Sequence, residues 1–417
     1  MTTTPSPTRG RNATVTDIAL PAEPPALQPP WATPSRVALL QQARDFTYSV
    51  VLPQANEFDR TEQTLPAAVI DGMASLGYFG ITVPKEYGGL GLGVFEYCMF
   101  SEELGRGWMS AASIIARGQG LGTRFSDPVR REATIRRSAL GQWVGAAAFS
   151  EPETGSDLAS VQTVAVRDGD GYLISGEKRW CGNAFEGDFI LVMCRIIEAD
   201  GSSGPIETFV LEKPRNSFPT GVTGTPIEKI GYHGIVSWAL TLTDVRATDA
   251  DIAEPFGFSG AEGRGLRAVE NGLNVARVQT AARAVGLARG AVEDTIDYLQ
   301  ERVQFGHPLG DFQALRFGIA EMLAKVTQAR AFYQQVAHLM DSGVPCEKEA
   351  AMVKLVATEM AVEVTGQALQ LHGGNGYTRE RAIERYWRDA RLTTIFEGTS
   401  EIQRKIISDR ILPRPAR

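Results

Sequence analysis

The last third of the chain consists of long segments in which apolar residues recur at helical spacing, and this feature constrains the fold most. These segments cover residues 264–301, 313–341, 347–371 and 400–411, and short connections join them. Long helices that are joined by short connections pack beside one another in antiparallel order. We therefore predict a C-terminal domain, residues 261–417, that folds as a four-helix bundle.

The rest of the chain divides into three regions. Residues 1–34 are rich in Thr and Pro and lack periodicity, which predicts a disordered tail. Residues 35–143 show helical spacing again and predict an N-terminal helical domain. Residues 144–260 contain short apolar runs separated by turns, which indicates strands, and we expect a middle β-barrel domain there. The predicted fold class is therefore α+β, and mostly α.

Composition excludes several classes of protein. The 417 residues carry a net charge of −7, whereas a nucleic-acid-binding protein usually shows a basic stripe. No apolar run approaches the length that spans a bilayer, so we expect a cytoplasmic protein with no membrane partner. The four cysteines are scattered without a paired motif, and no two histidines stand at ligand spacing, so we predict no metal site.

One carboxylate near the C-terminus has a suggestive setting. Glu397 follows the apolar residues Ile395 and Phe396 and precedes a Gly-Thr-Ser turn. Apolar surroundings disfavour the anion and raise the pKa of a carboxyl toward that of a general base at neutral pH. A loop carboxylate that faces solvent is also consistent with this sequence, so the segment alone does not distinguish a general base from an exposed side chain.

Four further motifs stand outside ordinary helix and strand patterns. The segment 150–157 (SEPETGSD) is a turn with hydroxyls and free backbone N–H groups, suited to an anion or a carbonyl-rich ring. The segment 176–183 (GEKRWCGN) carries Trp180. The segments 302–309 (RVQFGHPL, followed by Phe312 and Gln313) and 370–377 (QLHGGNGY) flank helical regions. Together with Glu397 and the domain order, they resemble the acyl-CoA dehydrogenase family, and the resemblance covers nearly all of the chain after the tail.

The resemblance implies a site for FAD. Phe149 and Ser150 are expected at the isoalloxazine and Trp180 across one of its faces, whereas Arg302 would reach the pyrophosphate from another subunit. This sharing of the cofactor implies a homotetramer or a homodimer. The full set of expected cofactor-binding residues is Phe149, Ser150, Ser156, Trp180, Gly182, Arg302, Gln304, Phe312, Gln313, Gln370, Gly373, Gly374, Thr399 and Glu401.

The chain departs from the family pattern at one of these positions. The family has Trp-Ile-Thr-Asn where this chain has Trp180-Cys181-Gly182-Asn183, so the threonine hydroxyl that bonds the flavin near N5 is missing. We expect any contact at that point to come from backbone or water, with a changed reduction potential or oxygen reactivity as the consequence.

The resemblance also implies the catalytic base. Some members take the base from the helix that holds Arg277, at the position just before this arginine. That position is Ala276 here, which cannot accept a proton, so Glu397 is the expected base. Its backbone N–H would help to polarise the thioester oxygen. The expected substrate-binding residues are Ser156, Asn274, Arg277, Gly398 and Arg117.

The implied function is FAD-dependent α,β-dehydrogenation of an acyl-CoA to the trans-2-enoyl-CoA, with an electron-transfer flavoprotein as acceptor. Arg117 matches a position at the far end of the acyl cavity, and a buried guanidinium needs an anion there. This favours a short acyl group that ends in a carboxylate or another polar group. An arginine that pairs with a neighbouring glutamate or faces solvent is equally consistent with the sequence at this position. The alternatives are an oxygen-using acyl-CoA oxidase, a relative similar to flavin monooxygenases, and a dehydrogenase of an acyl group bound to a carrier protein.

Overall fold

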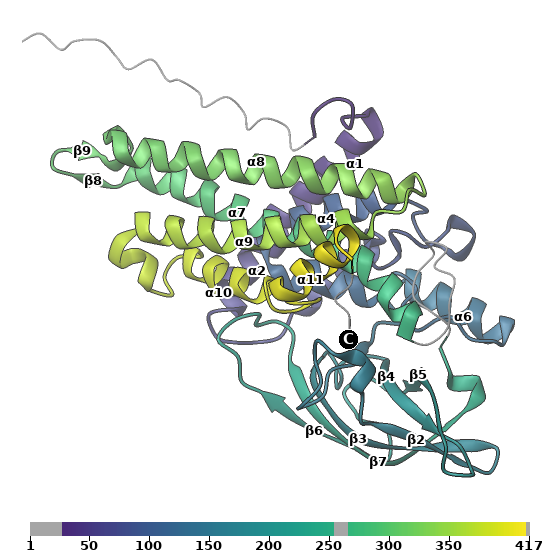
Figure 1. Ribbon diagram of the computed structural model, residues 1–417. Coiled ribbons are helices and arrows are strands. Elements are labelled where there is room, and N and C mark those ends of the chain that lie inside the picture. The colour runs from purple at the N-terminus through teal and green to yellow at the C-terminus, as the bar shows by residue number, and fades with distance from the viewer. Residues whose placement is uncertain (1–26, 254–265, 414–417) are drawn as a thin grey trace, which may run out of the picture.

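The computed structural model describes residues 27–253 and 266–413, in three successive regions (Figure 1). Long helices of the C-terminal region lie roughly parallel to one another, and the strands of the middle region gather at one side of them. Residues 1–26 of the predicted tail, and the predicted domain boundary after residue 260, fall outside the described residues. Within the described ranges, no helix is both long and apolar enough to cross a membrane.

The N-terminal region is helical, as predicted. Its α-helices are α1 (Pro34–Phe46), α2 (Leu52–Phe58), α3 (Ala67–Ser75), α4 (Val94–Gly107), α5 (Met109–Ile114) and α6 (Pro128–Ala139). Two of them begin with a polar cap followed by proline, which is a strong local start signal. Thr33 accepts the backbone N–H of Arg36 before α1, and Asp127 accepts that of Val129 before α6.

The structure differs from the predicted disordered tail at residues 27–33. Leu27 is 1% exposed and belongs to the main apolar core. The ring of Trp31 lies 5.4 Å from the ring of Phe95 and 4.8 Å from that of His338, measured between centroids. Burial of these two side chains offsets the entropy that ordering the segment costs.

Paired charges join α4 to two helices of the C-terminal region, α7 (Leu266–Glu301) and α8 (Gln313–Asp341). Arg289 of α7 donates to both carboxylate oxygens of Glu103, at 2.6 and 2.7 Å. Arg330 of α8 donates to Glu102 at 2.8 Å. A buried charge is tolerated only when it is paired, so these bonds fix how α4 and α7 face each other.

The middle region is a seven-stranded sheet in the order β1-β4-β2-β3-β7-β6, with β5 on β4. The strands are β1 (Ala146–Ala148), β2 (Val164–Asp168), β3 (Gly171–Gly182), β4 (Phe189–Ile197), β5 (Ser203–Glu212), β6 (Val222–Ile227) and β7 (Ser237–Thr248). All pairings are antiparallel except those of β1 and β2 with β4, which are parallel.

The predicted closed barrel is not found. β1 pairs with residues 190–192 of β4 and β2 with residues 195–197, so both lie along one side of the same strand. β5 takes the other side of β4 and β6 pairs only with β7, and among the described residues no pairing joins β5 to β6. The sheet therefore stays open, although the prediction of a middle β region is confirmed.

The C-terminal region is helical, as predicted, and contains one helix more than the sequence indicated. Its elements are α7 (Leu266–Glu301), the hairpin β8 (Val303–Gln304) and β9 (His307–Pro308), α8 (Gln313–Asp341), α9 (Glu347–Leu371), α10 (Ile383–Thr393) and α11 (Ser400–Ile411). The unpredicted helix is α10, which lies beside α7 and α9. It ends four residues before Glu397, so the end of this helix positions the turn that carries the Glu397 carboxylate.

Candidate active site

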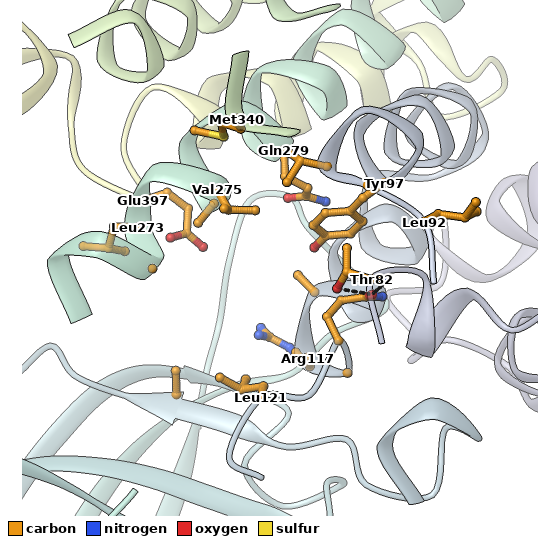
Figure 2. Close-up of a pocket in the computed structure, with 18 of the residues that line it drawn as sticks. Thr82, Leu92, Tyr97, Arg117, Leu121, Leu273, Val275, Gln279, Met340 and Glu397 are labelled. Carbon is orange, nitrogen blue, oxygen red and sulfur yellow. Dashed lines mark hydrogen bonds between the residues drawn. The ribbon is translucent and has the colours of Figure 1, made fainter. Parts of the chain in front are cut away.

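A cavity of about 420 Å³ lies where the three regions meet (Figure 2). Its walls come from α4, the segment after α5, β1, the first turns of α7, the end of α8 and the loop between α10 and α11. The polar side chains on its walls are Thr82, Tyr97, Arg117, Gln119, Gln279, Asp341 and Glu397, and the apolar ones include Leu92, Leu121, Phe149, Leu273, Val275, Ala276 and Met340. Such a mixed lining suits a ligand that has both apolar and polar parts.

Glu397 projects into this cavity from a tight turn. Its backbone has a φ of 55°, and the next residue, Gly398, has a φ of 88°. A non-glycine residue rarely adopts a positive φ, because its Cβ crowds the backbone, and such strain persists only where neighbouring contacts hold it. Here Gln403 donates to the Gly398 carbonyl at 2.8 Å, and Thr399 caps α11. The turn thus aims the Glu397 side chain away from the bundle and into the cavity.

Two buried cations lie behind the Glu397 turn. Lys354 of α9 is fully buried and donates to the Gly398 carbonyl at 2.7 Å. Burial lowers the pKa of Lys354 to about 8, against the opposing pull of Glu397. The guanidinium of Arg283 lies 4.8 Å from the centroid of the Phe396 ring, and burial lowers its pKa too. Both positive charges thus lie close to the turn that carries Glu397.

Arg117 reaches the cavity from the opposite side. Figure 2 shows its guanidinium and the Glu397 carboxylate directed into the same space from two different walls. Its Nε atom is buried and has no hydrogen-bond partner among the described residues. A Cβ atom built on Gly182 would clash with Nη2 of Arg117. The guanidinium therefore fills the space that the missing side chain leaves, where the sequence had predicted only backbone or water.

The two flavin motifs of the middle region are joined by a buried ion pair. Lys178 of β3 donates to Glu151 at 2.8 Å, and both side chains are almost wholly buried. Burial raises the pKa of Glu151, but hydrogen bonds from Lys178 and Thr163 and from backbone N–H groups outweigh it and hold the pKa below its usual range. The pair fixes the segment 150–157 to β3. Phe149, just before that segment, lines the cavity.

Trp180 is exposed at a β-bulge in β3. The pairing of β3 with β7 shifts register between Lys178 and Cys181, and Trp180 takes a φ of 62°. A bulge of this kind redirects a side chain, and 58% of Trp180 is left exposed to solvent. Ser156 and Gly155 are also exposed, and nothing lies within 4 Å of a Cβ built on Gly155. An open indole face beside a hydroxyl-bearing turn fits a flat aromatic cofactor.

Several predicted cofactor residues lie far from this cluster within one chain. Figure 1 places the β8–β9 hairpin and the end of α9 at one end of the bundle, whereas α11 and the start of α7 lie at the other. The residues at that distant end are Arg302, Gln304, Phe312, Gln313, Gln370, Gly373 and Gly374; all are exposed except Phe312, which is half-buried. A single chain therefore does not bring them to Trp180 or Glu397.

The remaining predicted residues lie close to the Glu397 turn or on α7. Thr399 is the cap of α11, and Glu401 is exposed in the first turn of that helix. Arg277 is buried and donates to Asn274 at 2.5 Å. The latter pair lies on the same helix as Ala276, which lines the cavity.

The cavity and turn residues that the sequence analysis did not predict include Tyr97, Gln279, Arg283 and Lys354. The signal for two of them was present: Gln279 and Arg283 interrupt a stretch of α7 that otherwise consists mainly of Val, Ala, Leu and Gly. A polar residue on a buried helix face requires a partner. For Tyr97 and Lys354 the sequence held no comparable signal.

Comparison with known proteins identifies the family. The N-terminal domain of acyl-CoA dehydrogenases matches residues 33–137, the middle domain 146–245 and the C-terminal domain 263–412. The chain belongs to the acyl-CoA dehydrogenase family. It is 34% identical to (2S)-methylsuccinyl-CoA dehydrogenase of Cereibacter sphaeroides over 89% of this chain and 68% of that protein.

Two further relatives place the chain in the same family. It is 34% identical to human mitochondrial short-chain specific acyl-CoA dehydrogenase, over 90% of this chain and 89% of that protein. The structure of butyryl-CoA dehydrogenase from Megasphaera elsdenii superposes with a TM-score of 0.82 at 30% identity, covering 91% of this chain and 98% of the other. As a member of this family the protein is a FAD-dependent oxidoreductase that acts on acyl-CoA thioesters.

Proposed function

We propose that Glu397 is the base of this acyl-CoA dehydrogenase and removes the proton α to the thioester. The observation that carries the proposal is the position of its carboxylate on the wall of the cavity, in a strained turn backed by Lys354 and Arg283. Ala276, the neighbouring wall residue on α7, has no group that accepts a proton.

The chain supplies the position and the charge for this proton transfer. The backbone N–H of Glu397 is the donor that would polarise the thioester carbonyl, since it belongs to the same turn. Trp180, Phe149 and the segment 150–157 would hold the flavin of one site, and the residues around Arg302 and Gln370 would serve the site of a neighbouring subunit. Bound FAD supplies the acceptor for the hydride that leaves the β-carbon.

Glu397→Gln tests the base directly. The variant should bind FAD as the wild type does, because the amide has the size of the carboxylate and the flavin residues are unchanged. Anaerobic flavin bleaching by butyryl-CoA in a stopped-flow instrument should slow by about 10²–10⁴-fold, the usual contribution of a general base. Glu380→Gln, which changes an exposed carboxylate at the far end of the bundle, is the control. Bleaching at the wild-type rate by Glu397→Gln would remove the assignment.

We further propose that the acyl group is short and ends in a carboxylate or another polar group that Arg117 binds. The buried Nε of Arg117 has no partner among the described residues, and a guanidinium pairs well with a carboxylate. The relative from Cereibacter sphaeroides acts, by its name, on a methylsuccinyl thioester, which ends in a carboxylate.

Arg117→Ala tests the acyl preference. Wild-type enzyme should reduce its flavin faster with methylsuccinyl-CoA than with butyryl-CoA, measured as kcat/KM. The variant should reverse that order, because it loses the charge but gains apolar space. Arg136→Ala, which removes an exposed arginine of α6, should keep the wild-type order. An unchanged order in Arg117→Ala would show that the end of the acyl group is recognised elsewhere.

The distance between the two groups of flavin residues within one chain supports a shared cofactor site, so we propose a homotetramer or homodimer. We propose an electron-transfer flavoprotein as the electron acceptor. Accumulation of hydrogen peroxide during aerobic turnover would instead identify oxygen as the acceptor.

A further inference from the structure

Gln279 is a buried polar residue of the long helix α7. It is 1% exposed, lies between the fully buried residues Val278 and Thr280, and lines the cavity one turn beyond Ala276. Because residues three apart share a helix face, Gln279 occupies the wall next to the point where Glu397 meets the acyl group. The catalytic proposal assigns no role to it.

The hydrogen bonds of Gln279 fix the orientation of its amide. Its Nε2 donates to the carbonyl of Ala112 at 2.9 Å and to the hydroxyl of Ser101 at 3.0 Å. The Ser101 hydroxyl itself donates to the carbonyl of Tyr97 at 2.8 Å, so it accepts from Gln279. A flipped amide would set its oxygen against the Ala112 carbonyl, where no hydrogen is available.

The amide oxygen is therefore left without a donor. Oε1 of Gln279 is buried and has no hydrogen-bond partner among the residues that the structure describes. An unsatisfied buried acceptor costs roughly 1–3 kcal/mol, and a ligand that supplies a donor recovers this free energy. A site of this kind discriminates strongly against an analogue that lacks the donor.

The charges around the cavity decide what kind of donor fits. Arg117 lines the cavity, and Arg283 donates to Ser113, which directly follows the Ala112 that holds the Gln279 amide. Two carboxylates, Glu397 and Asp341, also line the cavity, but Asp341 already accepts the backbone N–H groups of Val94 and Phe95. The positive charges of Arg117 and Arg283 disfavour an ammonium group in this space. A neutral hydroxyl can donate to Oε1 without this repulsion.

We propose that the acyl group of the substrate carries a hydroxyl, and that Gln279 recognises it through Oε1. The inference rests on the proposed function, because it places the acyl group in the cavity between Glu397 and Arg117. The substrate class is then a short hydroxyacyl thioester with a polar or anionic end. Gln279 is a specificity-determining residue for this class.

The test compares thioesters that differ by one group. Binding is measured with the FAD-loaded Glu397→Gln enzyme, which does not turn the ligands over, by the change in flavin absorbance. The ligands are butyryl-CoA, 3-hydroxybutyryl-CoA, 4-hydroxybutyryl-CoA and 3-aminobutyryl-CoA. One hydroxylated thioester should bind at least about tenfold more tightly than butyryl-CoA, which corresponds to about 1.4 kcal/mol.

The role of Gln279 is tested in the same background. Gln279→Met keeps the volume of the side chain but removes the acceptor, and the hydroxyl preference should fall below about threefold. Gln300→Met, which changes an exposed glutamine on the same helix, should keep the full preference. The comparison of ligands on the unchanged Gln279 protein stands even if Gln279→Met does not fold.

Three outcomes would overturn the inference. The hydroxyl preference is absent in the protein that retains Gln279, it persists in Gln279→Met, or the amino thioester binds most tightly. A failure of the proposed function is distinguishable from these. It would appear as rapid flavin reduction by Glu397→Gln or as an unchanged acyl preference in Arg117→Ala, whichever ligand Gln279 favours.

Discussion

At the scale of single residues, the buried ammonium of Lys354 makes the Glu397 turn sensitive to the pH of the medium. Its pKa is lowered by burial to about 8, so the group is charged at pH 7 and loses its charge as pH rises through 8. Because Lys354 donates to the Gly398 carbonyl, its charge strengthens a hydrogen bond that holds the Glu397 turn in place. Above pH 8 that support is lost.

We therefore expect the rate of flavin reduction to fall as pH rises through about 8 in the wild-type enzyme. Lys354→Met should be slower at pH 7, by about tenfold, and should lack this step in its pH profile. The measurement is anaerobic stopped-flow bleaching with butyryl-CoA between pH 6.5 and 9.5. Lys325→Met, which changes an exposed lysine of α8, should keep the step. A step of equal size in Lys354→Met would assign the ionisation to another group.

The sequence alone identified some of these residues because their signal is local. Glu397 lies in a motif of consecutive residues, and Arg117 is a charge in an apolar helical segment. Gln279 and Lys354 acquire their roles from contacts between distant parts of the chain, such as the bond from Gln279 to Ser101, 178 residues away. Such contacts depend on how α4, α7 and α9 pack, which no local pattern encodes.

At the scale of elements, helix α10 shows why the prediction of the fold was incomplete. Its buried residues include Ile383, Tyr386, Ala390 and Thr393, at helical spacing. The same face also buries the charged residues Arg385 and Asp389. Those charges are satisfied by other regions, as in the bond from Arg385 to Asn56 at 2.9 Å. The spacing of its apolar residues was therefore present in the sequence, but over only 11 residues, whereas α7, α8 and α9 continue for 25 residues or more.

The open sheet has a similar origin. Alternating apolar residues predicted most strands of the middle region, but they do not state which strands pair. β1 and β2 pair in parallel along one side of β4, and among the described residues no pairing joins the outer strands β5 and β6, so the sheet stays open. β1 has only three residues, too few for a period to be recognised.

At the scale of the whole molecule, a buried charge cluster joins the three regions. Asp59, at the end of α2, accepts from Arg388 of α10 at 2.6 Å and lies 3.6 Å from the His233 ring of the middle region. Asp389 of α10 accepts the backbone N–H of Tyr232 at 2.6 Å. Burial, together with the charge of Asp59, raises the pKa of Asp389 to about 6.

The sign of the resulting pH dependence follows from linkage. The pKa of Asp389 is higher in the folded than in the unfolded protein, where it is about 3.8, so the folded state binds more protons between about pH 4 and 6. The free energy of unfolding therefore falls as pH rises through this window. His233 acts in the same direction at higher pH, because its bond with Asp59 outweighs burial and raises its pKa above 6.5.

Asp389→Asn should abolish the loss of stability that the ionisation of Asp389 causes. The amide cannot ionise and can still accept the Tyr232 N–H, so the variant should gain stability relative to the wild type as pH rises from 4.5 to 7, by an amount on the order of 2 kcal/mol. Urea unfolding of the FAD-loaded enzyme at a series of pH values measures this difference. Glu132→Gln changes an exposed carboxylate of α6, and its free energy of unfolding should show the same pH dependence as that of the wild type. If the free energy of unfolding of Asp389→Asn shows that same pH dependence, the carboxyl of Asp389 does not titrate in this window. Other groups then cause the pH dependence of the charge cluster.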